Sequence, residues 1–183
     1  MRRGRNKRFF AADESRQRGG TVMEENTNWG QSVTGIVIRQ GRVLLARHTY
    51  GAGKGMLIVP GGYVKTGESP QDALKREFLE ETGIVVEPRE IIALRFNSHD
   101  WYIAFSADYV SGEAVSDQDE NDEVLWLETE EALLREDVPD LTKRLIRCAL
   151  SGSEGLVPLP YQGKPKHGKG YLYGVKGLES KAD

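Results

Sequence analysis

The segment at residues 60–84, PGGYVKTGESPQDALKREFLEETGI, constrains the fold of this chain more than any other stretch. Ser69 is a favoured N-cap residue, and Pro70 suits the first helical position because its missing N–H would be unpaired there. Gly83 is typical of a left-handed helix stop. The segment therefore predicts a glycine-rich turn followed by a helix over residues 70–82.

Three glutamates of this helix share one face. At about 100° per residue, Glu77, Glu80 and Glu81 fall within a ~100° arc, and Arg76 flanks that arc. Like charges at this spacing repel one another. A hard divalent cation would offset the repulsion, since such ions prefer carboxylate oxygens and share their shell with water and substrate phosphates. The glutamates alone leave two interpretations open, a solvated helix face and a cation site.

The surrounding sequence predicts a domain that mixes strands and helices. Apolar and β-branched runs bounded by turn residues indicate strands, and apolar residues at helical spacing indicate helices. The predicted strands are 33–39, 42–48, 56–60, 84–96, 101–110 and 124–128, and the predicted helices after the glutamate-rich one are 129–136 and 140–150. A tight turn is predicted at Gln40-Gly41, another near Ser98-His99, and an acidic loop over 111–123.

Both ends of the chain differ in composition from this domain. Residues 1–28 are rich in arginine and lysine without an apolar period, which predicts a disordered basic tail. Residues 151–183 are rich in Gly, Pro and Lys and predict a loosely ordered tail, whose tyrosines could pack on the domain or on a second copy of the chain. The folded domain is therefore predicted over 29–150, with a homodimer left open.

Composition limits the classes of protein to consider. The net charge of −3 favours neither nucleic acid nor an acidic membrane as the partner of the whole chain. Cys148 is the only cysteine, so no internal disulfide forms, and this indicates a reducing, cytoplasmic setting. No apolar run approaches the ~18 residues that a membrane span needs.

The segment that opened this section resembles the Nudix box. The family pattern is a glycine, five residues, a glutamate, seven residues, and then R-E-U-x-E-E-x-G-U, where U is a bulky apolar residue. Gly62, Glu68 and the run from Arg76 to Ile84 agree at every fixed position, and Phe78 is the one aromatic where an aliphatic is commoner. The resemblance implies an α/β fold, an α/β/α sandwich around a mixed β-sheet.

The same resemblance implies an enzyme and its site. Nudix hydrolases cleave the diphosphate linkage in a nucleoside diphosphate joined to another moiety, using Mg²⁺ or Mn²⁺. By position, Glu77, Glu80 and Glu81 correspond to metal ligands that the Gly62 carbonyl can join, and Arg76 corresponds to the residue that orients Glu77. Glu68 corresponds to the residue that supports the helix or reaches a metal through water.

The general base is a carboxylate of the box or of a later loop in this family. The later candidates here are Glu120 and Glu123, in the run QDENDEVLW. Glu123 is favoured because it lies just before the predicted strand and is better anchored. A solvated acidic turn is an equally good interpretation of this run.

The sequence does not identify the nucleotide. Arg47, at the end of a predicted strand, is a candidate for binding a phosphate, and Tyr102 is a candidate for binding the substrate, although packing explains both residues as well. The proline that resembles the ADP-ribose subtype is absent from the expected position. Two alternatives to a nucleotide pyrophosphohydrolase stay open: an RNA 5′-end pyrophosphohydrolase, which the basic tail supports, and a non-catalytic nucleotide sensor.

Overall fold

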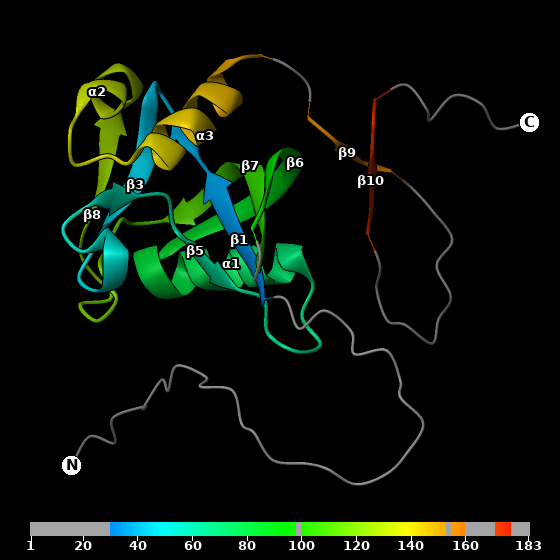
Figure 1. The fold of residues 1–183 in the computed structure, drawn as a ribbon, viewed down its shortest axis with the longest axis horizontal. Coiled ribbons are helices and arrows are strands. Elements are labelled where there is room, and N and C mark those ends of the chain that lie inside the picture. The colour runs from blue at the N-terminus through cyan, green and yellow to red at the C-terminus, as the bar shows by residue number, and fades with distance from the viewer. Residues whose placement is uncertain (1–29, 98–99, 153–154, 160–170, 177–183) are drawn as a thin grey trace, which may run out of the picture.

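The computed structural model describes residues 30–97, 100–152, 155–159 and 171–176 (Figure 1). The predicted basic tail at 1–28 and the predicted turn at Ser98-His99 lie outside the described residues.

The central sheet has four strands and mixed direction. These strands are β1 (Gly30–Ile36), β5 (Gly61–Tyr63), β6 (Ile84–Phe96) and β7 (Asp100–Gly112), in the order β5-β1-β7-β6. β1 runs parallel to β7, whereas β1 with β5 and β6 with β7 are antiparallel pairs. The mixed sheet is therefore the one that the resemblance implied.

A second sheet packs beside the first. Its strands are β2 (Ile38–Arg39), β3 (Arg42–His48), β4 (Leu57–Ile58) and β8 (Asn121–Glu128), and both β4 and β8 pair with β3. Gln40 and Gly41 have φ angles of 52° and 79°, which suits a tight hairpin between β2 and β3. The turn predicted at these two residues is confirmed.

The helices lie on opposite sides of the strands. α1 (Pro70–Thr82) covers one side, and α3 (Asp140–Leu150) covers the other, with the short α2 (Thr129–Leu134) beside it (Figure 1). The Ser69 hydroxyl accepts the Asp72 N–H, and Gly83 adopts φ 70°, so the predicted caps of α1 are confirmed.

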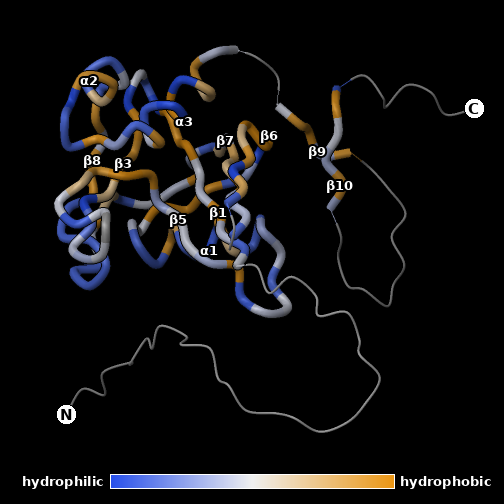
Figure 2. Tube along the Cα trace, viewed as in Figure 1, coloured by the Kyte–Doolittle hydropathy of each residue, from blue (hydrophilic) through white to orange (hydrophobic). Residues whose placement is uncertain are grey.

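Each side of the central sheet has its own apolar core. Ala73, Leu74 and Phe78 of α1 pack with alternate residues of the strands, and Leu145 and Ile146 of α3 pack on the opposite face. Apolar residues accordingly run along the strands in the middle of the molecule, and the polar ones lie at its loops (Figure 2). The α/β/α sandwich is confirmed, and it holds the glutamate-rich helix against the sheet.

Several predicted boundaries differ from the structure. The strand predicted over 33–39 is divided at Val37 into β1 and β2, the strand predicted over 56–60 is shortened to β4, and the predicted glycine-rich turn contains β5. β7 extends to Gly112 and β8 begins at Asn121, so the acidic loop is shorter than the predicted 111–123. α2 ends at Leu134 rather than at residue 136. In each case pairing or packing with another element decides where the element ends, and a pattern along one segment does not record that contact.

The described part of the C-terminal segment is ordered as strands, where the sequence predicts a loose tail. β9 (Val157–Leu159) pairs antiparallel with β10 (Leu172–Gly174), and Leu156 bridges to Ile91 of β6. Tyr173 lies in an edge-to-face contact with the buried Phe105, with 5.8 Å between ring centroids, and packs against the core cluster that includes Ala73 and Leu74 of α1. The segment therefore attaches to both the sheet and α1.

Replacing Tyr173 with alanine is expected to lower the free energy of unfolding by about 1–2 kcal/mol, because the variant loses an aromatic contact and its buried area. Thermal and urea unfolding measure the change. Tyr173→Phe is the control, since it keeps the ring and loses only the hydroxyl. An alanine variant as stable as the unmodified chain would show that this segment contributes nothing to the fold.

Candidate active site

Arg76 of α1 joins the carboxylates of the glycine-rich turn and the helix. Its Nε and Nη2 donate to the two oxygens of Glu68 over 2.7 and 2.9 Å. Its Nη1 donates to Glu77 over 2.5 Å and to Glu80 over 3.2 Å, and Nη2 also reaches the Tyr63 carbonyl over 3.1 Å. A planar guanidinium suits this two-sided recognition of carboxylates. The partners fix both the helix face and the turn that precedes it.

Glu77 lies directly against the backbone of Gly62. A β-carbon at position 62 would lie 2.6 Å from the Glu77 carboxyl carbon, so any side chain there would displace this carboxylate. Burial raises the pKa of Glu77, and Arg76 opposes that shift by stabilising the charged form. The glycine of the box is therefore required because a carboxylate occupies the space of its side chain.

Glu81 is the most deeply buried of the three glutamates, with 4% of its surface exposed. Its carboxylate accepts the Gly61 N–H over 3.1 Å, and its backbone carbonyl accepts the side-chain amide of Asn121 over 2.9 Å. Burial raises the pKa of Glu81 to about 8, and the negative charges of Glu77, Glu120 and Asp117 add to the shift. A site that raises a carboxyl pKa in this way favours a cation.

The donor set suits a hard divalent cation. Glu77 and Glu81 supply buried carboxylates, and Glu80, with 57% of its side chain exposed, lies at the outer edge of the same face. Within the described ranges, no three acidic, histidine or cysteine side chains form a ready-made metal cluster. Arg76 forms ion pairs with both Glu77 and Glu80, so a bound cation would share these carboxylates with the guanidinium.

The structure places Glu120 and Glu123 differently. Glu120 accepts a hydrogen bond from the Tyr50 hydroxyl over 3.0 Å, and its charge contributes to the raised pKa of Glu81. Glu123 instead pairs with Arg47 of β3 over 2.8 Å. Glu120 is therefore the acidic-loop carboxylate that the fold brings toward the box.

Arg47 is engaged with protein groups. It also donates to Asp137 over 3.0 Å and to the Gly55 carbonyl over 2.9 Å, and 25% of its side chain is exposed. These contacts connect β3, β8 and the segment between α2 and α3. A phosphate contact for Arg47 stays a prediction, and the geometry supports a structural role.

Asp137→Asn is expected to lower stability by about 0.5–1 kcal/mol at pH 7, because Asp137 pairs with two arginines while remaining 29% exposed. Hydrogen bonds from Arg135, and then from Arg47, hold the pKa of Asp137 well below its ordinary 3.8. This stabilisation is complete above pH 3.8 and is lost as the pH falls further. Chemical unfolding at pH 7 and pH 3 measures it: the difference between variant and unmodified chain should shrink at pH 3, and a constant difference would contradict the ion-pair explanation.

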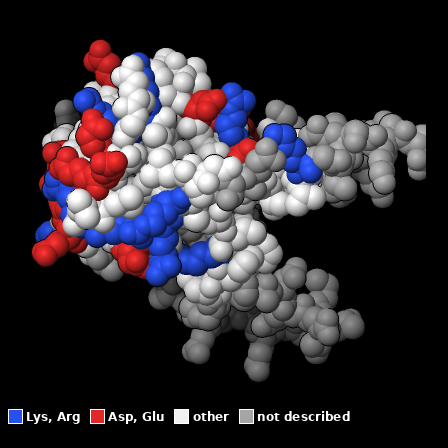
Figure 3. Space-filling model, turned by 90° about the horizontal axis from the view of Figure 1, so that it is seen from above, with Lys and Arg blue, Asp and Glu red and all other residues white. Residues whose placement is uncertain are grey.

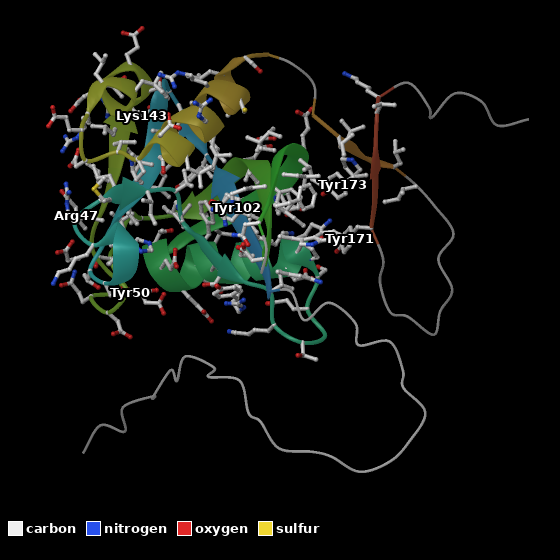
Figure 4. The ribbon with its side chains drawn as sticks, viewed as in Figure 1. Arg47, Tyr50, Tyr102, Lys143, Tyr171 and Tyr173 are labelled. Carbon is white, nitrogen blue, oxygen red and sulfur yellow. The ribbon has the colours of Figure 1, made fainter. Side chains whose placement is uncertain are left out.

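Tyr102 lies inside the fold on the side of β7 that faces α3 (Figure 4). The Arg95 guanidinium lies 4.7 Å from its ring centroid. Burial raises the pKa of Tyr102, and the charge of Glu81 adds to this shift. The residue therefore lies within electrostatic reach of the box, and its role in substrate binding stays a prediction.

Sequence reasoning missed two residues of this site. Tyr50 precedes the glycine-rich 3₁₀ turn (Gly51–Gly53), and its hydroxyl reaches the acidic loop. Asn121 begins β8 and is 1% exposed while bound to Glu81. Neither residue belongs to a motif, and only the pairing of β3 with β8 brings them to the box.

Comparison with known proteins identifies the family. The family model described as NUDIX domain matches residues 29–147, and the chain belongs to this family. A NUDIX hydrolase from Nitrosomonas europaea shares the fold with a TM-score of 0.63 at 22% identity, over 72% of this chain and 77% of that one.

Two curated relatives have different names. A protein named NAD-capped RNA hydrolase NudC, from Actinobacillus succinogenes, is 33% identical over 109 residues, which is 54% of this chain and 40% of the relative. A protein named ADP-ribose pyrophosphatase, from Methanocaldococcus jannaschii, is 29% identical over 48% of this chain and 56% of the relative. The chain thus matches about half the length of each relative.

No helix in the described residues is long and apolar enough to cross a membrane.

Proposed function

We propose that this chain hydrolyses the diphosphate linkage of a nucleoside diphosphate joined to another moiety, with the help of Mg²⁺ or Mn²⁺. The observation that carries the proposal is the arrangement of the box. The carboxylates of Glu77 and Glu81 are both buried next to the Gly61-Gly62 backbone, close enough for their negative charges to repel. Such a face is costly without a cation and useful with one.

The residues that would hold the cation are Glu77, Glu80 and Glu81, with the Gly62 carbonyl. When bound, the cation would neutralise diphosphate charge and lower the pKa of the attacking water. Arg76 orients Glu77 through the 2.5 Å contact, and it joins Glu68 to the same helix. The chain itself thus provides a fixed set of carboxylates on one rigid element.

Glu120 is our candidate for the general base. Its carboxylate would accept the proton of the water that attacks phosphorus. The charge coupling between Glu120 and Glu81 supports this assignment over Glu123, whose carboxylate pairs with Arg47.

The substrate class follows from the names of the two relatives, both of which denote a diphosphate-linked nucleotide. Tyr102 is the candidate that would contact the nucleoside, given its electrostatic reach to Glu81. Arg47 is the weaker candidate, because two carboxylates already occupy its guanidinium.

A nucleotide joined to RNA is the second candidate substrate. One curated relative is named an NAD-capped RNA hydrolase. Figure 3, which views the molecule from the side of α3, shows a band of lysine and arginine side chains beside acidic ones. α3 carries Lys143, Arg144 and Arg147, although Arg144 pairs with Asp140. Contacts of such residues with RNA phosphates would make RNA cleavage strongly dependent on salt.

The deciding experiment incubates the protein and Mg²⁺ with ADP-ribose, NADH, dinucleoside polyphosphates, (d)NTPs, NAD-capped RNA and triphosphorylated RNA. Phosphorus NMR identifies the products, and Glu77→Gln and Glu80→Gln serve as variants. Cleavage of a diphosphate bond that both variants lose supports the proposal, and the best substrate defines the specificity. Metal-dependent nucleotide binding without turnover of any compound would contradict hydrolysis and support a sensor.

A further inference from the structure

The acidic loop between β7 and β8 is a folded turn. The side chain of Asp117 accepts the backbone N–H groups of residues 119, 120 and 121 over 3.0 to 3.1 Å. The Ser116 hydroxyl donates to the Asn121 carbonyl over 2.8 Å and accepts the Gln118 N–H over 2.9 Å. Side chains that bond nearby backbone groups fix a turn in this way. The backbone that carries Glu120 is therefore fixed from within the loop.

Contacts on two sides fix the same backbone to the rest of the site. Thr49 donates its N–H to the Glu120 carbonyl over 3.1 Å and its hydroxyl to the Asp119 carbonyl over 2.8 Å. Asn121 donates to the Glu81 carbonyl on the box helix. Glu120 thus lies on a backbone held between the end of β3 and the C-terminal half of α1.

One side chain then fixes the Glu120 carboxylate. The Tyr50 hydroxyl donates to Glu120 Oε2 over 3.0 Å, and the Tyr50 ring lies against His48 with 5.7 Å between centroids. Figure 4 shows Tyr50 at the same end of the molecule as the second sheet. Burial first, then the bond to Glu120 and the charges of Glu81 and Glu77, raise the pKa of Tyr50. The phenol therefore stays neutral and faces the carboxylates of the site.

The chemistry of the donor matters for what Glu120 can do. A neutral hydroxyl orients a carboxylate without placing a positive charge beside it, whereas a guanidinium forms an ion pair that makes the carboxylate less basic. The same loop shows the contrast, because Arg47 pairs with Glu123. A carboxylate that takes a proton from water is a better base without a fixed cation beside it.

We propose that Tyr50 is a positioning residue that aims the Glu120 carboxylate at the box glutamates. Tyr50 acts through Glu120 and does not itself exchange a proton or bind the cation. The kinetic part of this proposal rests on the proposed function, whereas the contact between the two side chains does not.

A double-mutant cycle tests the role of Tyr50. Tyr50→Phe removes one hydroxyl and is expected to lower kcat about 10-fold with little change in KM, the size expected for a residue that orients a reacting group. Glu120→Gln is expected to lower kcat by about 10²-fold or more. In the double variant, the Tyr50→Phe effect should disappear, because the carboxylate that it orients is gone. An equal Tyr50→Phe effect in both backgrounds would overturn the proposal.

Two controls distinguish a loss of Glu120 orientation from a general loss of structure or activity. Tyr109→Phe also removes one tyrosine hydroxyl bond, the exposed one to the Gly112 carbonyl, and is expected to leave kcat unchanged. The contact itself is measured without turnover, from the ¹³C resonance of the Tyr50 ring carbon that bears the hydroxyl. That resonance should move in Glu120→Gln and stay in Glu123→Gln. If it moves and no substrate is cleaved, the contact is supported and the proposed function fails; if it does not move, the Tyr50 proposal fails.

Discussion

Glu81→Gln is expected to raise the stability of the metal-free protein while it strongly lowers turnover. Glu81 is 4% exposed, and burial raises its pKa to about 8, so its charged form destabilises the fold at neutral and alkaline pH. A glutamine has nearly the same shape, still accepts the Gly61 N–H, and carries no charge. The gain is expected to be on the order of 1–3 kcal/mol at pH 8, and kcat is expected to fall about 10²–10⁴-fold.

The raised pKa of Glu81 determines whether stability rises or falls with pH. The pKa of Glu81 is raised in the folded state relative to its ordinary 4.5. The stabilisation from the protonated form is therefore complete below pH 4.5 and is lost as the pH rises toward 8. Urea unfolding in EDTA between pH 5 and pH 8.5 should show stability falling in the unmodified chain more steeply than in Glu81→Gln. Added Mg²⁺ should stabilise the unmodified chain more than the variant.

Glu128→Gln is the matched control for this experiment. Glu128 forms an exposed ion pair with Arg42, with 54% of its side chain accessible, so its loss should change stability by less than about 1 kcal/mol and leave kcat unchanged. A Glu81→Gln variant that is less stable than the unmodified chain, or that keeps full turnover, would contradict the view that this carboxylate is retained for a cation.

The local features of this fold could be predicted because local chemistry determines them. Ser69, Pro70 and Gly83 define the ends of α1 through capping bonds within one turn of the helix. Helical periodicity placed Arg76 and the three glutamates on one face. The resemblance then implied the sandwich, which no pattern within a single segment specifies.

The remaining features depend on contacts between distant segments. Asn121 reaches Glu81 across 40 residues of sequence, and Tyr50 reaches Glu120 across 70. Tyr173 finds the core beside Phe105 only because the C-terminal strands lie along β6. Sequence reasoning favoured Glu123 as the base because it adjoins a strand, but it could not see that Arg47 lies opposite it in the pairing of β3 with β8.

Arg76→Ala is expected to lower the free energy of unfolding by about 3–5 kcal/mol. Arg76, Glu68 and Glu77 have side chains only 19%, 15% and 13% exposed, so the variant leaves two partly buried carboxylates without their cationic partner. Urea unfolding at pH 7 measures the loss. Lys75→Ala is the neighbouring control on α1, since Lys75 is 40% exposed and its pair with Glu87 contributes little.

Arg76→Lys separates charge from geometry at the same position. A lysine restores the positive charge, yet its single ammonium cannot donate at once to both oxygens of Glu68, to Glu77 and to the Tyr63 carbonyl. We expect the lysine variant to recover part of the stability and to lose about 10–100-fold in kcat, because Glu77 is no longer held in one orientation. If lysine restored both stability and kcat, the charge alone would suffice. If it restored neither, the planar fork would be needed to fold the glycine-rich turn onto the helix as well as to orient its carboxylates.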